Sequence, residues 1–336
     1  MTYLYFTQPR KDAGLFNSYV SKQKANVQYL KQNPGLYYQD TLTKIIYNNN
    51  PWQTSFPSEA DYDQLNLEKS FSIYKQLFGN AYGMHFTFAG NIDPKTAKPL
   101  LEKYLGSLPA SPKENAFKDN NIRPVKGIVN AAIKKGKDPK STISLVFTGE
   151  TEYSPEEDIT LQALLEVLNF KVIEKLREEM GSIYGGSFYG GISKRPYTNF
   201  TIRASVPCGP ENVEKLTAGL MDIIKTAQQN IDQKDLDKVK ENWRKQNNVN
   251  LQSNGFWLRT LSHAWIERNN PEDILLFSER MEKLTTTDLQ KAAQKYLTLN
   301  NYIKAVLYPE NNSVAEQKAA IEVGNLCKQF PIYQDL

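Results

Sequence analysis

The stretch "EKLREEMGSIYGGSFYGG", residues 174–191, decides how the C-terminal part of the chain folds. A helical pattern leads into it and a strand pattern follows, with glycines between them. A P-loop or a dinucleotide fingerprint needs the opposite order, in which a strand leads through glycines into a helix. The stretch therefore predicts a helix-to-strand turn that presents Arg177 and Tyr184. Its five glycines are Gly181, Gly185, Gly186, Gly190 and Gly191.

The elements around this turn are predicted from capping and from alternation. Ser154, Pro155 and Glu157 form a capping box with proline at the first helical position. The helix that follows is apolar on most of its circumference, which predicts burial on more than one side and a C-terminal cap at Gly181. Alternating apolar residues predict strands at 141–150 and 199–206, and amphipathic helices and a strand at 301–309 follow.

The N-terminal part gives a mixed pattern. Residues 1–8 are aromatic-rich and predict a strand, and helices are predicted from about residue 12 to 30, 37 to 47 and 67 to 78. Met84, Phe86 and Phe88 alternate as in a half-buried strand. Asp93 and Pro94 then begin a helix, and the Pro/Ser/Lys-rich residues after it form the predicted linker.

An internal repeat links the two parts. Residues 74–91 align without a gap on residues 293–310, helix end on helix end and strand on strand. Upstream, "FTQPRKDAGLF" resembles "SVPCGPENVEKL", a strand that turns into a helix. The repeat predicts that the first unit lacks its leading third or more, so that the chain is the tail of a longer protein. An open sheet edge would then be covered by a second copy or by domain swapping, or the chain would be only marginally soluble.

Composition excludes several function classes. The 41 basic and 37 acidic side chains give a net charge of +4, which offers no argument for nucleic-acid binding. No apolar run approaches the roughly 20 residues of a membrane span. The N-terminal residues lack a basic start followed by an apolar core, so they do not form a signal peptide. Cys208 and Cys327 are expected to be buried thiols.

The chain shows no self-contained hydrolytic machinery. Its only histidines, His85 and His263, belong to no H-x-x-E-H or H-E-x-x-H sequence, and no cysteine pair has zinc spacing. Both histidines are expected to be structural or on the surface, and no metal site is predicted. Arg177 and Tyr184 remain. Arg177 can be a surface charge at a helix end and Tyr184 can be packing, but together they could donate hydrogen bonds to a peptide carbonyl or an oxyanion.

Three stretches resemble the pitrilysin/insulinase family of zinc metalloproteases, the inverzincins. Residues 78–109, "FGNAYGMHFTFAGNIDPKTAKPLLEKYLGSLP", resemble the family's strand–helix segment. Residues 176–188, "LREEMGSIYGGSF", resemble the arginine-x6-tyrosine motif of the family's C-terminal, non-metal-binding half. Residues 4–12, "LYFTQPRKD", resemble part of the third of four homologous domains.

The resemblance implies an α+β fold, with antiparallel-rich mixed sheets covered by helices in one truncated and one complete domain. Residues 1–110 would be the end of a third domain, 111–125 a linker and 126–336 a fourth domain. The implied function is the C-terminal part of a zinc metalloendopeptidase that is inactive alone. Arg177 and Tyr184 would contact the substrate or transition state, supported by the glycine-rich turn at Gly181, Gly185 and Gly186.

The implied partners are the N-terminal zinc-binding half and a peptide substrate, with a homodimer through the truncated sheet as a further possibility. Zinc would be the cofactor of the full-length protein, and a periplasmic or envelope location would follow the family. Two alternatives stay open: a non-catalytic scaffold or assembly protein, and a peptide-binding module, on the same fold.

Overall fold

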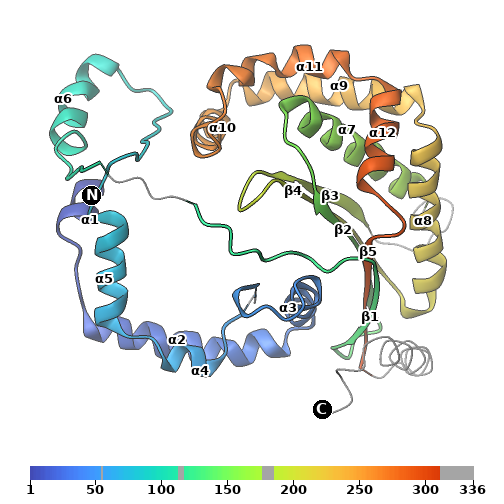
Figure 1. Ribbon diagram of the computed structural model, residues 1–336, viewed down its shortest axis with the longest axis horizontal. Helices are drawn as coiled ribbons and strands as arrows, with labels where there is room; N and C mark the ends of the chain where they lie inside the picture. Colours follow the sequence, from blue (N-terminus) through green and yellow to red (C-terminus); the bar gives the residue numbers. More distant parts are fainter. Residues whose placement is uncertain (54–55, 113–116, 176–184, 311–336) are drawn as a thin grey trace. The chain divides into compact units, whose positions relative to one another are not determined.

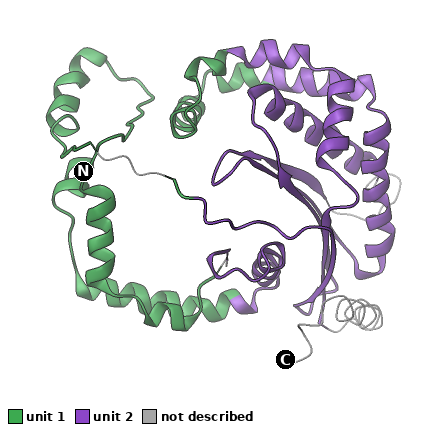
Figure 2. Ribbon diagram, viewed as in Figure 1, with its two compact units in different colours: residues 1–30, 56–118, 246–275 green, residues 31–55, 119–245, 276–336 purple. Residues whose placement is uncertain are grey.

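The computed structural model describes residues 1–53, 56–112, 117–175 and 185–310. These residues form two compact units, each assembled from separate stretches of chain (Figure 2). Unit 1 comprises residues 1–30, 56–118 and 246–275, and unit 2 comprises 31–55, 119–245 and 276–336. The domain boundaries predicted at residues 110 and 126 stay a prediction.

Unit 2 contains a five-stranded mixed sheet, which confirms the predicted α+β class (Figure 1). The strand order is β1-β5-β2-β4-β3. β1 and β5 are parallel, and the other neighbouring strands are antiparallel. The strands are β1 (Ile128–Lys134), β2 (Ser141–Glu150), β3 (Ser187–Ser193), β4 (Asn199–Cys208) and β5 (Tyr302–Tyr308).

One face of this sheet is covered by a layer of helices, of which α7 is the most deeply buried. As predicted, Ser154 caps α7 by accepting from the Glu157 N–H, and Pro155 is its first residue. Leu164 and Leu168 on α7 are fully buried with Phe147 of β2, and each such side chain contributes about 1.5–3 kcal/mol. The other helices of the layer are α8 (Val213–Gln229), α9 (Gln233–Asn250), α11 (Phe277–Lys283) and α12 (Thr286–Tyr296), and α7 itself is Pro155–Val172.

The other face of the sheet is covered in part by α3 (Pro34–Ile46). Tyr38 and Leu42 of α3 pack among buried residues of β1, β2 and β5, and the Tyr38 hydroxyl donates to the Ala305 carbonyl at 3.0 Å. The helix was predicted from about residue 37. It begins at Pro34 because the Asn33 side chain accepts from the Leu36 N–H and a proline suits the first helical position.

In the described residues, unit 1 is built from helices and loops. Three helices lie where the sequence predicts them, and Ser58 and Asp61 form a capping box at the start of α4. The helices are α1 (Thr2–Thr7), α2 (Ala13–Gln32), α4 (Glu59–Asp63), α5 (Leu67–Phe78), α6 (Pro94–Tyr104) and α10 (Asn254–Ile266). Short 3-10 turns lie in unit 2 at η1 (Pro51–Gln53) and η3 (Pro210–Asn212), and at the boundary of the two units at η4 (Pro271–Leu276).

Two strand predictions in this part are wrong. Residues 2–7 form the helix α1, where Tyr3 packs against Tyr104 and Phe6 against Phe78, so these aromatics are spaced for a helix. The upstream match of this segment to a strand is therefore wrong as well. Residues 84–90 have the alternation of a strand but form none in the structure. A strand needs a ladder partner, and all five strands of the described chain belong to unit 2.

The internal repeat extends well beyond the aligned segment. The alignment of residue 74 with residue 293 is an offset of 219 residues, and this offset carries four consecutive helices of the first copy onto four of the second. Every helix end agrees within one residue after the shift. The pairs are α2 with α9, α3 with α10, α4 with α11 and α5 with α12.

The two copies also exchange a helix. Residues 31–55, which hold α3 of the first copy, belong to unit 2. Residues 246–275, which hold the equivalent helix α10 of the second copy, belong to unit 1. Each unit is thus built mainly from one copy of the repeat and contains one helix of the other copy, α10 in unit 1 and α3 in unit 2.

Candidate functional site

The predicted site lies on the connection between α7 and β3. Arg177, Tyr184 and Gly181 fall in residues 176–184, outside the described residues. Gly185 and Gly186, and the helix and strand that flank the connection, are described. The structure therefore describes the two elements on either side of the predicted site, α7 and β3.

Two amide side chains of α7 bind the backbone of the edge strand β3. The Phe188 N–H donates to Asn169 Oδ1 at 2.6 Å, and Asn169 Nδ2 donates to the Phe188 carbonyl at 3.1 Å. Gln162 Nε2 donates to the Gly190 carbonyl at 3.1 Å. Some backbone N–H and carbonyl groups of β3 that point away from β4 are thus hydrogen-bonded to side chains of the helix. We call Asn169 and Gln162 the amide anchor.

The glycines of the turn have different roles. A Cβ on Gly186 would lie 3.0 Å from Val206 and 3.3 Å from Val172, so this glycine allows β3 to approach α7 closely. A Cβ on Gly185 would meet nothing within 4 Å. Gly190 has φ +149°, and a Cβ there would lie 2.1 Å from the Thr201 carbonyl oxygen. Gly186 and Gly190 are therefore required by packing and backbone conformation.

On the face opposite α7, β3 and β4 present polar side chains. Arg203 of β4 donates to Gln39 of α3 at 2.8 Å and to Ser144 of β2 at 3.2 Å. Tyr189 of β3 is 47% exposed beside this group. Burial raises the pKa of Tyr38, whose hydroxyl already donates to the Ala305 carbonyl, so this phenol stays neutral. The donors of Arg203 are thus used within the fold, and Tyr189 is an exposed tyrosine of the edge strand.

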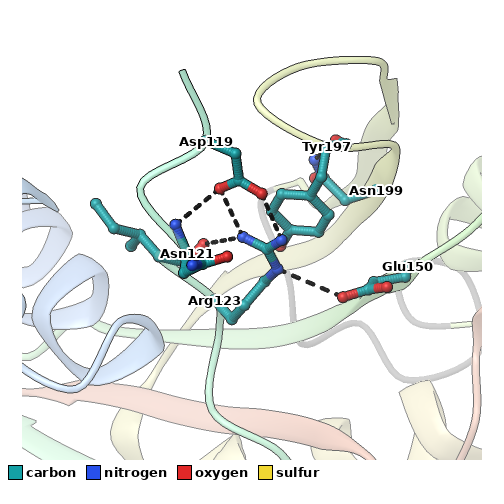
Figure 3. Close-up of polar contacts among 7 residues, drawn as sticks. Asp119, Asn121, Arg123, Glu150, Tyr197 and Asn199 are labelled. Carbon is teal, nitrogen blue, oxygen red and sulfur yellow. Dashed lines mark hydrogen bonds and ion pairs between the residues drawn. The ribbon is translucent and has the colours of Figure 1, made fainter.

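A second polar group lies where β2 ends and β4 begins (Figure 3). Arg123 donates to both carboxylate oxygens of Asp119, at 3.0 and 2.7 Å, and to Glu150 at 3.4 Å. Its guanidinium lies 3.4 Å from the ring centre of Tyr197, and the two are stacked in Figure 3. Hydrogen bonds from Arg123 and from the Asn121 N–H hold the pKa of Asp119 below its usual value.

The hydrogen bond with Asp119 raises the pKa of Arg123, and burial raises the pKa of Tyr197. The single positive charge of Arg123 is shared between Asp119 and Glu150. The group therefore fastens residues 119–123 to the sheet.

The start of α7 carries a third network. Glu157 accepts hydrogen bonds from Lys295 and from the Tyr296 hydroxyl. Burial raises the pKa of Glu157, but these two hydrogen bonds outweigh burial and leave it below its usual value. Tyr296 has no exposed surface, and the carboxylate satisfies its hydroxyl. This network ties α12 to α7 and belongs to the fold.

His85 and the described cysteine pack against other residues, and His263 lies on the surface. His85 stacks on Trp265 with ring centres 4.6 Å apart, and His263 is an exposed residue of α10. Cys208 is buried, and burial raises its pKa to about 12, which keeps the thiol protonated. Cys327 lies outside the described residues.

The described residues do not fit a zinc site, because no group of three His, Cys, Asp or Glu side chains among them could hold a metal ion. Nor does any helix in the described ranges have the length and apolarity to cross a membrane.

Sequence reasoning missed the amide anchor and the Arg123 group. The anchor had a readable signal, because Asn169 and Gln162 are seven positions apart on a helix that is apolar on most of its circumference, and such residues share a face. Arg123 had none, since two of its three partners, Glu150 and Tyr197, are distant in sequence and are brought to it by the sheet.

Comparison with known proteins identifies the family. Residues 64–242 match the family model described as the peptidase M16 inactive domain. A zinc protease PQQL-like protein of Arabidopsis thaliana is 24% identical over 272 residues, which cover 73% of this chain and 28% of that protein. The probable zinc protease PqqL of Escherichia coli is 20% identical over 300 residues, which cover 87% of this chain and 32% of that protein. This chain therefore spans about a third of the length of these relatives.

Solved structures share the fold. The periplasmic protease PqqL from Escherichia coli superposes with a TM-score of 0.73 at 17% identity, over 89% of this chain and 33% of that one. The ferredoxin protease FusC in complex with Arabidopsis ferredoxin gives a TM-score of 0.73 at 14% identity, over 92% of this chain and 34% of that one. The resemblance to the C-terminal, non-metal-binding half of these proteases is confirmed. Since the family model matches more than half of its residues, the chain belongs to the M16 peptidase family of zinc proteases and contains that family's inactive domain.

Proposed function

We propose that this chain is the C-terminal part of a zinc metalloendopeptidase. It closes over an extended peptide and supplies Arg177 and Tyr184 to a zinc centre held by an N-terminal half. The chain alone is inactive. In this proposal residues 1–110 are the C-terminal part of the third homologous domain, residues 126–336 are the fourth domain, and residues 111–125 are the linker between them.

The anchoring of the α7–β3 connection carries this proposal. Asn169 holds β3 to α7 through two hydrogen bonds to Phe188, and the buried face of α7 is fixed in the core. The two elements that flank Arg177 and Tyr184 in the sequence are therefore fixed to each other. Catalytic side chains depend on such rigid supports.

The chemistry follows from the two side chains. Arg177 carries five N–H donors and a permanent charge, and Tyr184 carries one hydroxyl donor. Both suit the main-chain carbonyl of a bound peptide and the negative charge that develops on its oxygen during hydrolysis. When bound in the other half, zinc supplies Lewis-acid polarisation and an activated water.

The proposals for the substrate class and the cellular compartment rest on similar proteins. One solved neighbour is a ferredoxin protease and another is a periplasmic protease. For this chain we propose an extended polypeptide substrate recognised through its main chain, and a periplasmic or envelope location.

Substitution of Tyr184 tests the proposal. In the protease assembled with its zinc-binding half, Tyr184→Phe should lower kcat by about 10-fold or more, as loss of one oxyanion donor does. Tyr189→Phe is the matched control, because Tyr189 is an exposed tyrosine on β3 with no assigned role in the reaction. Equal kinetics for Tyr184→Phe and the control would favour the scaffold function.

A further inference from the structure

A groove that takes no part in the candidate site lies in the helix layer of unit 2. It has a volume of about 560 Å³ and is lined by the start of α7 and by α11 and α12. The helix α7 contacts both of the others, and all the lining residues belong to unit 2 (Figure 1). The volume falls within the range of roughly 300–1,000 Å³ that is typical of ligand-binding pockets.

The floor of the groove is apolar. It is formed by Ile159 of α7, Ala292 of α12 and Leu284, which follows α11, and these three residues are buried members of the main core cluster. Leu276, at the start of α11, is 41% exposed and adds apolar surface. The carbon chains of lysine and arginine side chains extend such a surface toward the charged rim. The floor can therefore hold an apolar side chain of a ligand.

The walls carry four cations and four carboxylates, and the two carboxylates of α7 are already paired. Glu156 accepts a hydrogen bond from Arg280 at 2.7 Å. Glu157 accepts from Lys295 and from the Tyr296 hydroxyl, both at 2.5 Å. These contacts join α7 to α11 and to α12. The negative charges of α7 are therefore neutralised by cations of the same groove.

The other two carboxylates are bound by neighbours in sequence. Asp288 Oδ2 accepts from the N–H and the hydroxyl of Thr285, at 3.0 and 2.6 Å, in the capping box of α12. Glu279 pairs with Lys283 on α11 at 2.6 Å. Their side chains are 59% and 72% exposed, and surface pairs of this kind contribute little to stability. Lys283 can therefore exchange this partner for a ligand at small cost.

Lys291 of α12 has no partner among the described residues. It is exposed in the wall of the groove and forms no hydrogen bond or ion pair with any of them. In the sequence, Lys291 and Lys283 directly adjoin the floor residues Ala292 and Leu284. Each lysine ammonium has three N–H donors. The groove thus places two cations that can bind a ligand beside an apolar floor, and each described carboxylate of its lining is already hydrogen-bonded.

We propose that this groove binds the C-terminal carboxylate of a polypeptide that ends in an apolar residue. The carboxylate accepts charge-assisted hydrogen bonds from Lys291 and Lys283, and the last side chain of the polypeptide lies on the floor. A C-terminal residue carries both groups on one Cα atom, so both fit into a single compact groove. An internal acidic residue carries no apolar side chain, and its main chain continues in both directions. The proposal does not depend on the hydrolytic role of the chain.

Titration of the chain with short peptides, followed by NMR, is the first test. The probe is an acetylated hexapeptide of glycine and serine residues that ends in leucine with a free carboxylate. We expect a Kd of about 1 mM or lower, and binding at least ~10-fold weaker for the same peptide with a C-terminal amide, because charged hydrogen bonds are lost. The free acid that ends in glycine should also bind ~10-fold more weakly, since it leaves the floor empty.

Substitution of the two lysines tests where the peptide binds. Lys291→Gln and Lys283→Gln should each weaken binding of the leucine acid by ~5-fold or more and leave the weak binding of the amide unchanged. Lys245→Gln is the matched control, because the Lys245–Glu241 pair lies on α9, outside the groove. It has the same spacing in sequence, the same distance of 2.6 Å and the same lysine exposure of 72% as the Lys283–Glu279 pair. This variant should bind the leucine acid as the parent chain does.

Each outcome of these titrations decides the proposal. All three lysines are exposed, so the variants should unfold at the same urea concentration as the parent chain. No binding of the leucine acid at about 10 mM, or equal binding of the amide or of the glycine acid, overturns the proposal. Binding that neither groove variant weakens, or that Lys245→Gln weakens equally, places the carboxylate elsewhere on the chain and overturns it as well.

Discussion

Asn169 on α7 pairs with both backbone groups of Phe188 on β3, as a neighbouring strand would. The Phe188 N–H donates to Asn169 Oδ1 at 2.6 Å, and Asn169 Nδ2 donates to the Phe188 carbonyl at 3.1 Å. The amide thus replaces a ladder partner at the edge of the sheet and fixes the start of β3 to the helix before it.

Asn169→Ala should destabilise the chain by about 2–3 kcal/mol, because it leaves a buried N–H and carbonyl of Phe188 without partners. Gln162→Ala is the control, since its single bond to Gly190 is exposed, and it should cost only about 0.5 kcal/mol. Urea unfolding followed by circular dichroism measures both. Equal urea midpoints for the two variants would show that the two hydrogen bonds at Phe188 stabilise the chain no more than the single bond at Gly190.

Gly190→Ala should destabilise the chain by about 2–4 kcal/mol, because φ there is +149° and the new Cβ would strike the Thr201 carbonyl. Gly185→Ala places its Cβ in open space and should change stability by less than about 1 kcal/mol. Thermal unfolding of the two single variants compares them directly. A Gly190→Ala chain as stable as Gly185→Ala would mean that the backbone of β3 is not held in this conformation.

The Glu157 network predicts a pH dependence on the acid side. The hydrogen bonds from Lys295 and Tyr296 hold the folded-state pKa of Glu157 below its unfolded value. Its stabilising contribution is therefore complete above the unfolded pKa and is lost as the pH falls through the lower folded pKa. Glu157→Gln should flatten this part of the stability profile, which denaturation between pH 3 and pH 7 measures. If Glu157→Gln loses stability at acid pH as the parent chain does, that loss comes from other carboxylates.

The predictions that succeeded rest on local signals. The alternation of Ile143, Leu145 and Phe147 identified β2, and Ser154 with Pro155 identified the start of α7. These signals are complete within a few residues, because caps and periodicity are set by the local backbone. The family followed from motifs, and the matching range confirms it.

The predictions that failed depend on distant partners. Residues 84–90 have the alternation of a strand, but whether they form one depends on what pairs with them. Residues 1–8 have the aromatic content of a strand, yet Tyr3 and Phe6 pack on α6 and α5 as parts of a helix. At the candidate site, Arg177 and Tyr184 were predicted from the glycine-rich turn and from the family motif. Asn169 and Gln162 were missed, because their hydrogen bonds to β3 depend on how the helix packs on the strand.

The central claim is that these 336 residues complete a hydrolytic centre whose metal is held elsewhere. The most direct measurement is the cleavage rate of a fluorogenic peptide by the zinc-loaded N-terminal half, alone and with increasing amounts of this chain. We predict no cleavage by this chain alone at any zinc concentration. We also predict a rate with both parts that exceeds the N-terminal half alone, and that falls by about 10-fold or more when the chain carries Arg177→Gln with Tyr184→Phe. Cleavage by the chain alone, or full rate with the doubly substituted chain, would contradict the account.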